Sequence, residues 1–262
     1  AYLDEESEVI VSRSSFPVYD KYTQVMRATL VKTPLNESYG LDLEAMARAI
    51  NERTKLIFVC NPNNPTGAIV LADEVEAFMS RVPDRVLVIF DEAYYEMVDC
   101  DKFPDTLKYV RAGQGNVMVM RTFSKVYGIA GIRLGYAIAA PETLAPLFQA
   151  KGVFEVNRLA QAAGVAALED AAFLKQSIES NRAGLRYLYG EFERLGLNYI
   201  ESHGNFVLAE IGPRAVEVQQ QLLKEGVIVR PCTSYDLPNF LRISVGTQAQ
   251  NERLIEALES VL

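Results

Sequence analysis

Short apolar segments alternate with amphipathic helical patterns through the first half of the chain, and this alternation restricts the possible folds more than any other feature. We expect strands at residues 8–12, 55–60, 86–90, 117–120 and 134–139, with helices between several of them, as at 41–52 and 72–81. Strands and helices that alternate at this spacing are typical of βαβ units around a mostly parallel sheet. The first half therefore predicts an α/β fold.

The pattern changes after Pro141, where helical segments dominate. Helices are expected at 144–149, 158–168, 172–195 and 215–225 and from residue 248, and strands at 198–201, 206–210, 227–230 and 241–245. This order indicates a smaller α+β unit with an antiparallel sheet. Since 262 residues suffice for two domains, we expect a large domain of residues 1–165 and a small C-terminal domain of residues 166–262.

A polar cluster directly follows each of three apolar strands. The sequence NPNNPTG occupies residues 61–67, DEAY residues 91–94 and RTFSK residues 121–125. In open α/β sheets, ligands bind beyond the carboxyl ends of the strands. We therefore expect four side chains to converge at one edge of the sheet: Asn64, Asp91, Tyr94 and Lys125.

The third cluster places a lysine among groups that bind phosphate. Lys125 follows Thr122 and Ser124, and Arg133 comes eight residues later in a glycine-punctuated turn. An amine condenses with an aldehyde, while hydroxyls and a guanidinium hold a phosphate. This combination predicts a site for a phosphorylated aldehyde, pyridoxal 5'-phosphate (PLP). The alternative is that Lys125 is an ordinary solvated loop lysine.

The other two clusters supply what the ring of PLP requires. The ring withdraws electrons only while its pyridine nitrogen is protonated, and a neighbouring carboxylate such as Asp91 favours that proton. The 3'-oxygen needs neutral donors, which the Asn64 amide and the Tyr94 hydroxyl provide. The alternatives are that Asp91 is a helix N-cap, that Tyr94 is a core residue and that NPNNPTG is only a turn.

Composition argues against several other classes of protein. The net charge of −8 and pI near 4.9 do not suggest a nucleic-acid-binding protein, and no apolar run approaches the ~20 residues of a membrane span. Cys60, Cys100 and Cys232 form no CxxC pair, and His203 is the single histidine, so we expect no metal site or disulfide framework. Free thiols and the lack of a visible signal peptide favour the cytoplasm.

The motifs NPNNPTG, DEAY, TFSK and GIRLG, followed by LRISVGT at residues 241–247, occur in one order from about Glu8 to the last residue. In this the chain resembles the fold-type I PLP-dependent aminotransferases, and within them the histidinol-phosphate aminotransferases. The resemblance implies a large PLP-binding domain, a small C-terminal domain, PLP as cofactor and a homodimer that acts on small amino donors and acceptors.

The resemblance also implies individual roles. Lys125 would condense with the cofactor and carry the proton between substrate and cofactor, Asp91 would hold the pyridine nitrogen, and Asn64 and Tyr94 the 3'-oxygen. The remaining cofactor contacts would come from Thr122, Ser124 and Arg133 at the phosphate and from Phe16 stacked on the ring. The family usually has Pro-Thr before this aromatic residue, where the present chain has Ser14 and Ser15.

For the substrate, Arg242 helped by Arg230 would receive the phosphate of histidinol phosphate and, in the other half-reaction, the carboxylate of glutamate. Tyr235 would line the same pocket. Glu155, in a segment where the family usually has Asn-Val-Asn, would place a negative charge near these anions. The alternatives are an aminotransferase for aromatic or other amino acids, a related PLP decarboxylase, or a non-catalytic protein of the same fold.

Members of the family carry a further N-terminal segment, with a helix that helps to bind the cofactor phosphate and a tyrosine that reaches into the partner's site. Nothing before Glu8 resembles it. We therefore expect that these 262 residues are a fragment and that they bind PLP weakly on their own.

Overall fold

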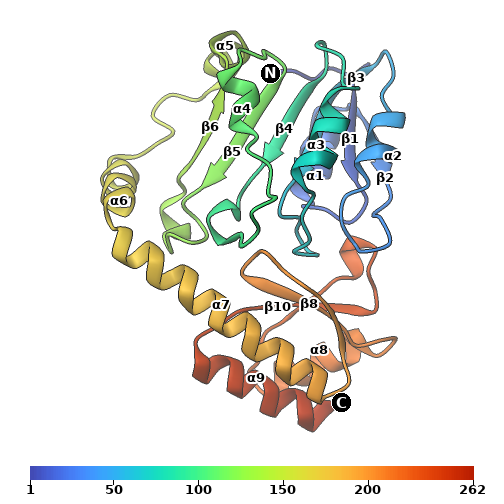
Figure 1. The fold of residues 1–262 in the computed structure, drawn as a ribbon, viewed down its shortest axis with the longest axis vertical. Helices are drawn as coiled ribbons and strands as arrows, with labels where there is room; N and C mark the ends of the chain where they lie inside the picture. Colours follow the sequence, from blue (N-terminus) through green and yellow to red (C-terminus); the bar gives the residue numbers. More distant parts are fainter.

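A computed structural model describes all 262 residues of the chain. The fold contains two sheets, which lie one below the other in Figure 1. The larger sheet has six strands in the order β2-β1-β3-β4-β5-β6, and only the edge strand β6 runs antiparallel to its neighbour. The smaller sheet has the order β7-β8-β10-β9 and is antiparallel throughout. The predicted α/β fold with a second antiparallel sheet is confirmed.

The larger sheet is built from the first 139 residues. Its strands are β1 (Glu8–Ser12), β2 (Thr29–Thr33), β3 (Thr54–Cys60), β4 (Leu87–Asp91), β5 (Val117–Thr122) and β6 (Gly135–Ala139). Its helices are α1 (Val18–Val25), α2 (Leu43–Arg48), α3 (Ala72–Met79), α4 (Leu107–Arg111) and α5 (Pro141–Ala150). The five predicted strands are present, whereas β2, α1 and α4 were not predicted.

Helices cover both faces of the larger sheet, which explains why its central strands are apolar without alternation. On one face, Met46 of α2 and Phe78 of α3 pack against Ile57 and Phe90. On the other face, Tyr19 of α1 packs against the strand residues that point away from α2 and α3. The leucines of α5 lie at the edge of this second apolar cluster. The sheet is therefore the middle of three layers, and its upper and lower rims are left for loops.

The smaller unit contains β7 (Asn198–Ile200), β8 (Phe206–Glu210), β9 (Arg230–Pro231), β10 (Phe240–Ser244), α7 (Ala171–Arg194), α8 (Ala215–Lys224) and α9 (Gln248–Val261). Leu188 and Phe192 of α7, Leu222 of α8 and Leu258 of α9 form its core against β8 and β10. The strand predicted at 227–230 was wrong in its bounds, since pairing with β10 begins only at Arg230. The proposed boundary at residue 165 falls inside α6 (Arg158–Glu169) and stays a prediction.

The loops after β3 contact the smaller unit directly. The His203 N–H donates to the Gly67 carbonyl at 2.9 Å, and Gly67 has a φ of +75°. A Cβ atom at Gly67 would lie 2.6 Å from the Ser202 Cβ, so only glycine allows this close approach. The carboxyl ends of the parallel strands therefore face the smaller sheet, as Figure 1 shows.

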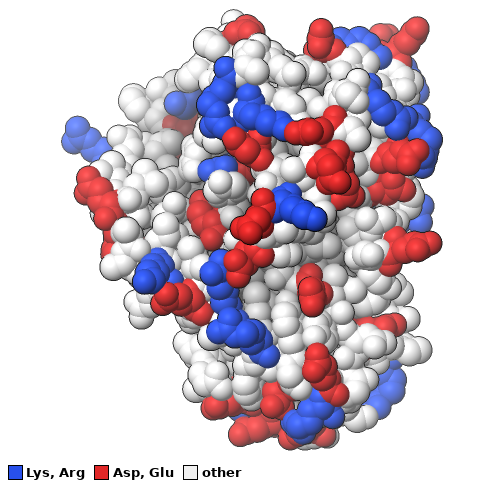
Figure 2. Space-filling view, in the orientation of Figure 1, with Lys and Arg blue, Asp and Glu red and all other residues white.

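The face of the molecule drawn in Figure 2 carries charges of both signs. Figure 2 shows acidic and basic side chains interspersed over one face, without the continuous basic area that nucleic-acid-binding proteins present. None of the helices combines the length and the apolar character needed to cross a membrane.

Candidate active site

Backbone pairing brings the three polar clusters to one rim of the larger sheet. The Asn61 N–H donates to the Asp91 carbonyl at 3.0 Å, and the Glu92 N–H donates to the Met120 carbonyl at 2.9 Å. The strands thus stay paired up to the residues at which the polar clusters begin. The expected convergence of the DEAY, NPNNPTG and RTFSK segments therefore follows from the parallel register of β3, β4 and β5.

Asp91 ends β4 as a carboxylate with hydrogen bonds but no ion pair. Its Oδ2 accepts from the Tyr19 hydroxyl at 2.6 Å, and its Oδ1 accepts from the Ala93 N–H at 3.2 Å. Burial raises the pKa of Asp91, while these two hydrogen bonds and the charge of Lys125 lower it. The N-cap of the following 3-10 helix is Tyr94, so the alternative of Asp91 as a helix cap is wrong.

Lys125 is half-buried and has neither a hydrogen bond nor an ion pair within the protein. Its Nζ lies 5.1 Å from the centroid of the Tyr94 ring. Burial and the nearby charge of Arg242 lower the pKa of Lys125, whereas the charge of Asp91 raises it. An amine whose pKa is depressed in this way is more often deprotonated at neutral pH, the form that attacks a carbonyl carbon.

Tyr94 and Asn64 are both buried beside this lysine and Arg242. The Tyr94 ring meets the Phe206 ring edge-on at 5.3 Å, and its hydroxyl has no hydrogen-bond partner. Burial raises the pKa of Tyr94, so the hydroxyl is a neutral donor at physiological pH. The Asn64 Oδ1 accepts from Arg242 Nη1 at 2.5 Å, which leaves the amide NH₂ as the donor that is still free.

The loop after β5 brings Thr122 and Ser124 together, because the Ser124 N–H donates to Thr122 Oγ1 at 3.0 Å. Thr122 Oγ1 also lies 3.4 Å from the carbonyl of Leu134, the residue after Arg133. Arg133 is exposed, has a left-handed φ of +61° and donates from Nη1 to the Ala130 carbonyl at 2.7 Å. Its guanidinium has no ion-pair partner, so most of its donors are free for an anion.

Phe16 lies at the same rim and is exposed, with its ring centroid 5.7 Å from that of Tyr19 in an edge contact. The two serines that replace the family's Pro-Thr before it are buried and anchored to the NPNNPTG loop. The Ser15 hydroxyl donates to Asn63 Oδ1 at 2.9 Å, and Asn63 Nδ2 donates to the Ser14 carbonyl at 2.9 Å. These bonds hold the loop before Phe16 in place without the usual proline.

The smaller sheet contributes two arginines on neighbouring strands, since Arg242 of β10 pairs with Arg230 of β9. Besides its bond to Asn64, Arg242 has a buried Nε with no partner in the protein. Arg230 is exposed, makes no ion pair and lies 6.0 Å from the ring of Tyr235. Glu155 instead belongs to an exposed loop, where it accepts from the Gly152 N–H at 2.7 Å.

A cleft of about 410 Å³ opens beside Lys125, between the loop after β5 and the smaller unit. Its lining is mostly polar and includes Lys125, Gly128, Ser177, Asn205, Thr247 and Gln250. The cleft places the lysine at the junction of the two sheets. No cluster of histidine, cysteine, aspartate or glutamate side chains is arranged to hold a metal ion.

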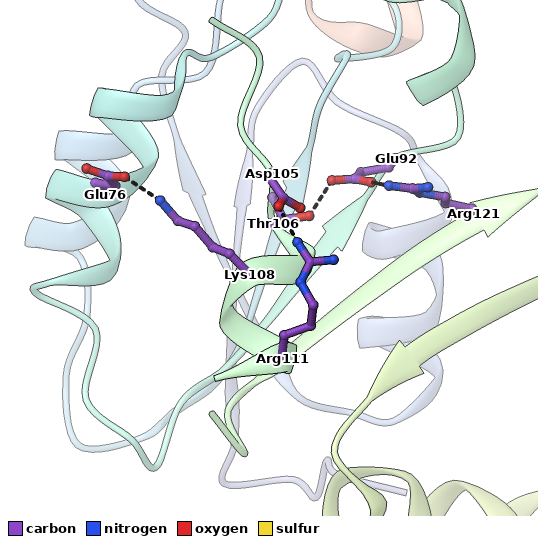
Figure 3. Close-up of polar contacts among 7 residues, drawn as sticks. All are labelled: Glu76, Glu92, Asp105, Thr106, Lys108, Arg111 and Arg121. Carbon is purple, nitrogen blue, oxygen red and sulfur yellow. Dashed lines mark hydrogen bonds and ion pairs between the residues drawn. The ribbon is translucent and has the colours of Figure 1, made fainter. Parts of the chain in front are cut away.

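Behind this rim lies a buried ion pair, drawn in Figure 3, that the motifs did not indicate. Arg121 Nη2 lies 2.7 Å from Glu92 Oε2, and the Thr106 hydroxyl donates to the other carboxylate oxygen. The Arg121 Cζ also lies over the Tyr95 ring, 3.5 Å from its centroid. Glu92 lies within DEAY beside Asp91, and Arg121 lies within RTFSK beside Thr122, and that position was the available signal.

Comparison with known proteins places this site in a family. The model of the family described as aminotransferase class I and II matches residues 1–258. A histidinol-phosphate aminotransferase of Moorella thermoacetica is 46% identical over 261 residues, which are 100% of this chain and 67% of that protein.

Two solved structures extend the comparison. The histidinol-phosphate aminotransferase of Sinorhizobium meliloti in complex with pyridoxal-5'-phosphate superposes with a TM-score of 0.92 at 28% identity, over 99% of this chain and 72% of that one. The aspartate aminotransferase of Thermus thermophilus with maleate gives 0.88 at 27% identity, over 100% of this chain and 71% of that one. The resemblance predicted from the motifs is confirmed, and the chain belongs to the aminotransferase class I and II family.

Proposed function

We propose that this chain transfers an amino group between glutamate and imidazole-acetol phosphate, giving 2-oxoglutarate and histidinol phosphate, or the reverse, with PLP as cofactor. Membership of the family makes it a PLP-dependent transaminase. The observation that carries the choice of substrate is the 46% identity, over the whole chain, to a histidinol-phosphate aminotransferase. This reaction belongs to histidine biosynthesis.

The residues at the rim fit PLP. Asp91 is a half-buried carboxylate without an ion-pair partner, and the Asn64 amide and the Tyr94 hydroxyl are each free to donate. Thr122, Ser124 and Arg133 supply two hydroxyls and a guanidinium for a phosphate, and Phe16 offers a ring face. When bound, the cofactor supplies an electron sink, because its protonated pyridine ring stabilises the charge left on the substrate Cα.

The protein side chains supply the proton transfers and the hydrogen bonds to the cofactor. Asp91 keeps a proton on the ring nitrogen, since an opposite charge favours the protonated form. Lys125, whose pKa is lowered, would hold the cofactor when substrate is absent and would take the Cα proton when substrate is present. Tyr94 and Asn64 would donate hydrogen bonds to the 3'-oxygen.

Arg242 is the group that we assign to the substrate anion. Its buried Nε has no partner in the protein, and a buried donor of this kind calls for an acceptor. A planar guanidinium pairs equally with a carboxylate and with a phosphate, so one residue serves glutamate and histidinol phosphate in turn. Arg230, exposed on the adjacent strand, adds a second positive charge for the doubly charged phosphate.

A single-turnover assay tests the choice of substrate. The PLP form is mixed in separate reactions with the same concentration of each amino donor, and the decay of the cofactor absorbance is followed. The donors are histidinol phosphate, glutamate, phenylalanine, tyrosine and aspartate. Histidinol phosphate and glutamate should react fastest. The aspartate aminotransferase neighbour makes other amino acids the second candidate, and faster reaction with aspartate or an aromatic amino acid would overturn the assignment.

We further propose a cytoplasmic homodimer with domains of residues 1–165 and 166–262. Three unpaired cysteines suit a reducing compartment. The segment around α6 leaves large apolar side chains in solvent, with Val153, Phe154 and Leu159 more than 75% exposed, and such surfaces are typical of association sites. Sedimentation equilibrium should give twice the chain mass, and a monomer at micromolar concentration would contradict the proposed dimer.

A further inference from the structure

We propose that Tyr19 is a positioning residue whose hydroxyl holds the Asp91 carboxylate in the orientation that keeps the cofactor ring nitrogen protonated. The inference rests on the proposed function, because it concerns how Asp91 meets PLP. The Tyr19 hydroxyl donates a hydrogen bond to Asp91 Oδ2 at 2.6 Å, which joins two residues 72 positions apart.

The Tyr19 side chain is held rigidly. It belongs to the first turn of α1, is 5% exposed and stacks on Phe58 with ring centroids 4.4 Å apart and an angle of 11° between the rings. Phe16 meets the same ring edge-on at 5.7 Å. Packing on both sides leaves the phenol little freedom of rotation, so its hydroxyl is a donor at a fixed position.

The hydroxyl completes the fixation of the carboxylate. Asp91 Oδ1 accepts from the Ala93 N–H of the following turn, and Oδ2 accepts from Tyr19. Each oxygen therefore has one protein donor, and rotation of the carboxylate would break both bonds. An ionised carboxylate accepts about four hydrogen bonds, so capacity for the ring nitrogen remains.

The charged and titratable groups around Asp91 determine how strongly the hydrogen bond from Tyr19 affects the pKa of this carboxylate. Cys60 faces Asp91 from β3, Lys125 from the loop after β5 and Tyr19 from α1. Burial raises the pKa of the Cys60 thiol to about 12 and also raises that of Tyr19, so both stay protonated at neutral pH. Tyr19 is the largest cause that lowers the pKa of Asp91 and opposes its burial.

The consequence concerns the proton shared by Asp91 and the ring nitrogen. Without the tyrosine hydroxyl, the half-buried Asp91 carboxylate holds a proton more strongly, and the ring nitrogen holds it less strongly. A hydrogen bond to a charged group is strong enough that Tyr19→Phe should lower the pH at which the ring nitrogen titrates by about one to two pH units. At pH 8, kcat should fall about tenfold or more, with KM changed less than threefold.

The experiment uses the full chain loaded with PLP that carries ¹⁵N in its ring, and follows the ¹⁵N resonance from pH 6 to 10. Tyr109→Phe is the matched control, since Tyr109 is also a buried tyrosine, 9% exposed, but its hydroxyl has no partner. The Tyr19→Phe resonance should move toward the unprotonated position at a lower pH than in wild type, while Tyr109→Phe follows wild type. A Tyr19→Phe titration identical to wild type would overturn the inference.

Two further measurements keep the test decisive. Substitution of Tyr19 by 3-fluorotyrosine replaces one ring hydrogen by fluorine, keeps the hydroxyl and strengthens it as a donor, so it should raise the titration pH; an unchanged titration would again overturn the inference. With a cofactor analogue that has carbon in place of the ring nitrogen, Tyr19→Phe should leave the half-reaction rate unaltered, and an equal loss of rate would show a purely structural role. A wild-type chain that binds no PLP would instead refute the proposed function, and this inference with it.

Discussion

The buried ion pair between Glu92 and Arg121 provides a prediction whose size follows from the structure. We expect Arg121→Met to destabilise the fold strongly. Glu92 is 1% exposed and Arg121 13% exposed, and both lie behind the rim that carries the candidate site. Methionine preserves the apolar contact with Tyr95 but leaves the carboxylate with only the Thr106 hydroxyl as a side-chain partner.

The expected magnitude comes from comparing this pair with an exposed one in the same view (Figure 3). Removal of one partner from a buried pair costs about 3–5 kcal/mol, because the other charge stays buried. The Arg111–Asp105 pair has exposed fractions of 62% and 58%, and exposed pairs contribute about 0–1 kcal/mol. Arg111→Met therefore serves as a control that removes the same charge a short distance away.

The loss in Arg121→Met should depend on pH in a defined direction. Burial already raises the pKa of Glu92, and Arg121 is one of the groups that lower it. Without Arg121, the pKa of Glu92 in the folded state rises further above its pKa in the unfolded chain. Between these two pKa values the folded state therefore binds more protons than the unfolded chain. The variant should then lose stability as pH rises from the ordinary glutamate pKa of about 4.3 toward the raised value.

Urea unfolding of both variants and wild type at pH 5.5 and pH 8, followed by circular dichroism, measures these differences. Arg121→Met should show a lower free energy of unfolding at both pH values and a larger deficit at pH 8. Arg111→Met should stay within about 1 kcal/mol of wild type. A deficit below 1 kcal/mol for Arg121→Met, or one that shrinks at pH 8, would refute the account of the buried pair.

Three further predictions address the site and the junction of the two units. Asp91→Asn should lower kcat by orders of magnitude with a smaller loss of PLP affinity, and unchanged kcat in steady-state assays would show that its charge is not used. Arg242→Ala should raise KM for glutamate and for histidinol phosphate together, and an effect on one substrate alone would contradict the shared anion site. Gly67→Ala should lower the free energy of unfolding by about 1–3 kcal/mol in urea titrations, because φ is +75° and Ser202 occupies the space; wild-type stability would contradict this.

The sequence predicted the central strands well because parallel strands covered on both faces are apolar at every position. It failed at β2, an edge strand of sequence TLVKT whose residues are mostly half-exposed, so that neither a continuous nor an alternating apolar pattern remains. Helix α1 is only eight residues long, which is too short for a helical periodicity to be recognised in the sequence. The missed strand is thus a poorly buried one, and the missed helices α1 and α4 are short.

The candidate site was predictable as far as its residues lie within local motifs. Asp91, Tyr94 and Lys125 follow strand ends, and strand register alone brings them together. Contacts between distant segments were not predictable from spacing: Tyr19 reaches Asp91 across 72 positions and Arg242 reaches Asn64 across 178. Such contacts depend on how helices and the two units pack, which sequence periodicity does not encode.

The most direct test of the central claim asks which lysine carries the cofactor. The chain is incubated with PLP, treated with borohydride to make the link to lysine irreversible, digested and examined by mass spectrometry, with Lys125→Ala in parallel. With PLP in excess, the account predicts modification confined to Lys125 in wild type, and neither that modification nor any turnover in the variant. Modification spread over exposed lysines such as Lys175, with Lys125 unmodified, would contradict it.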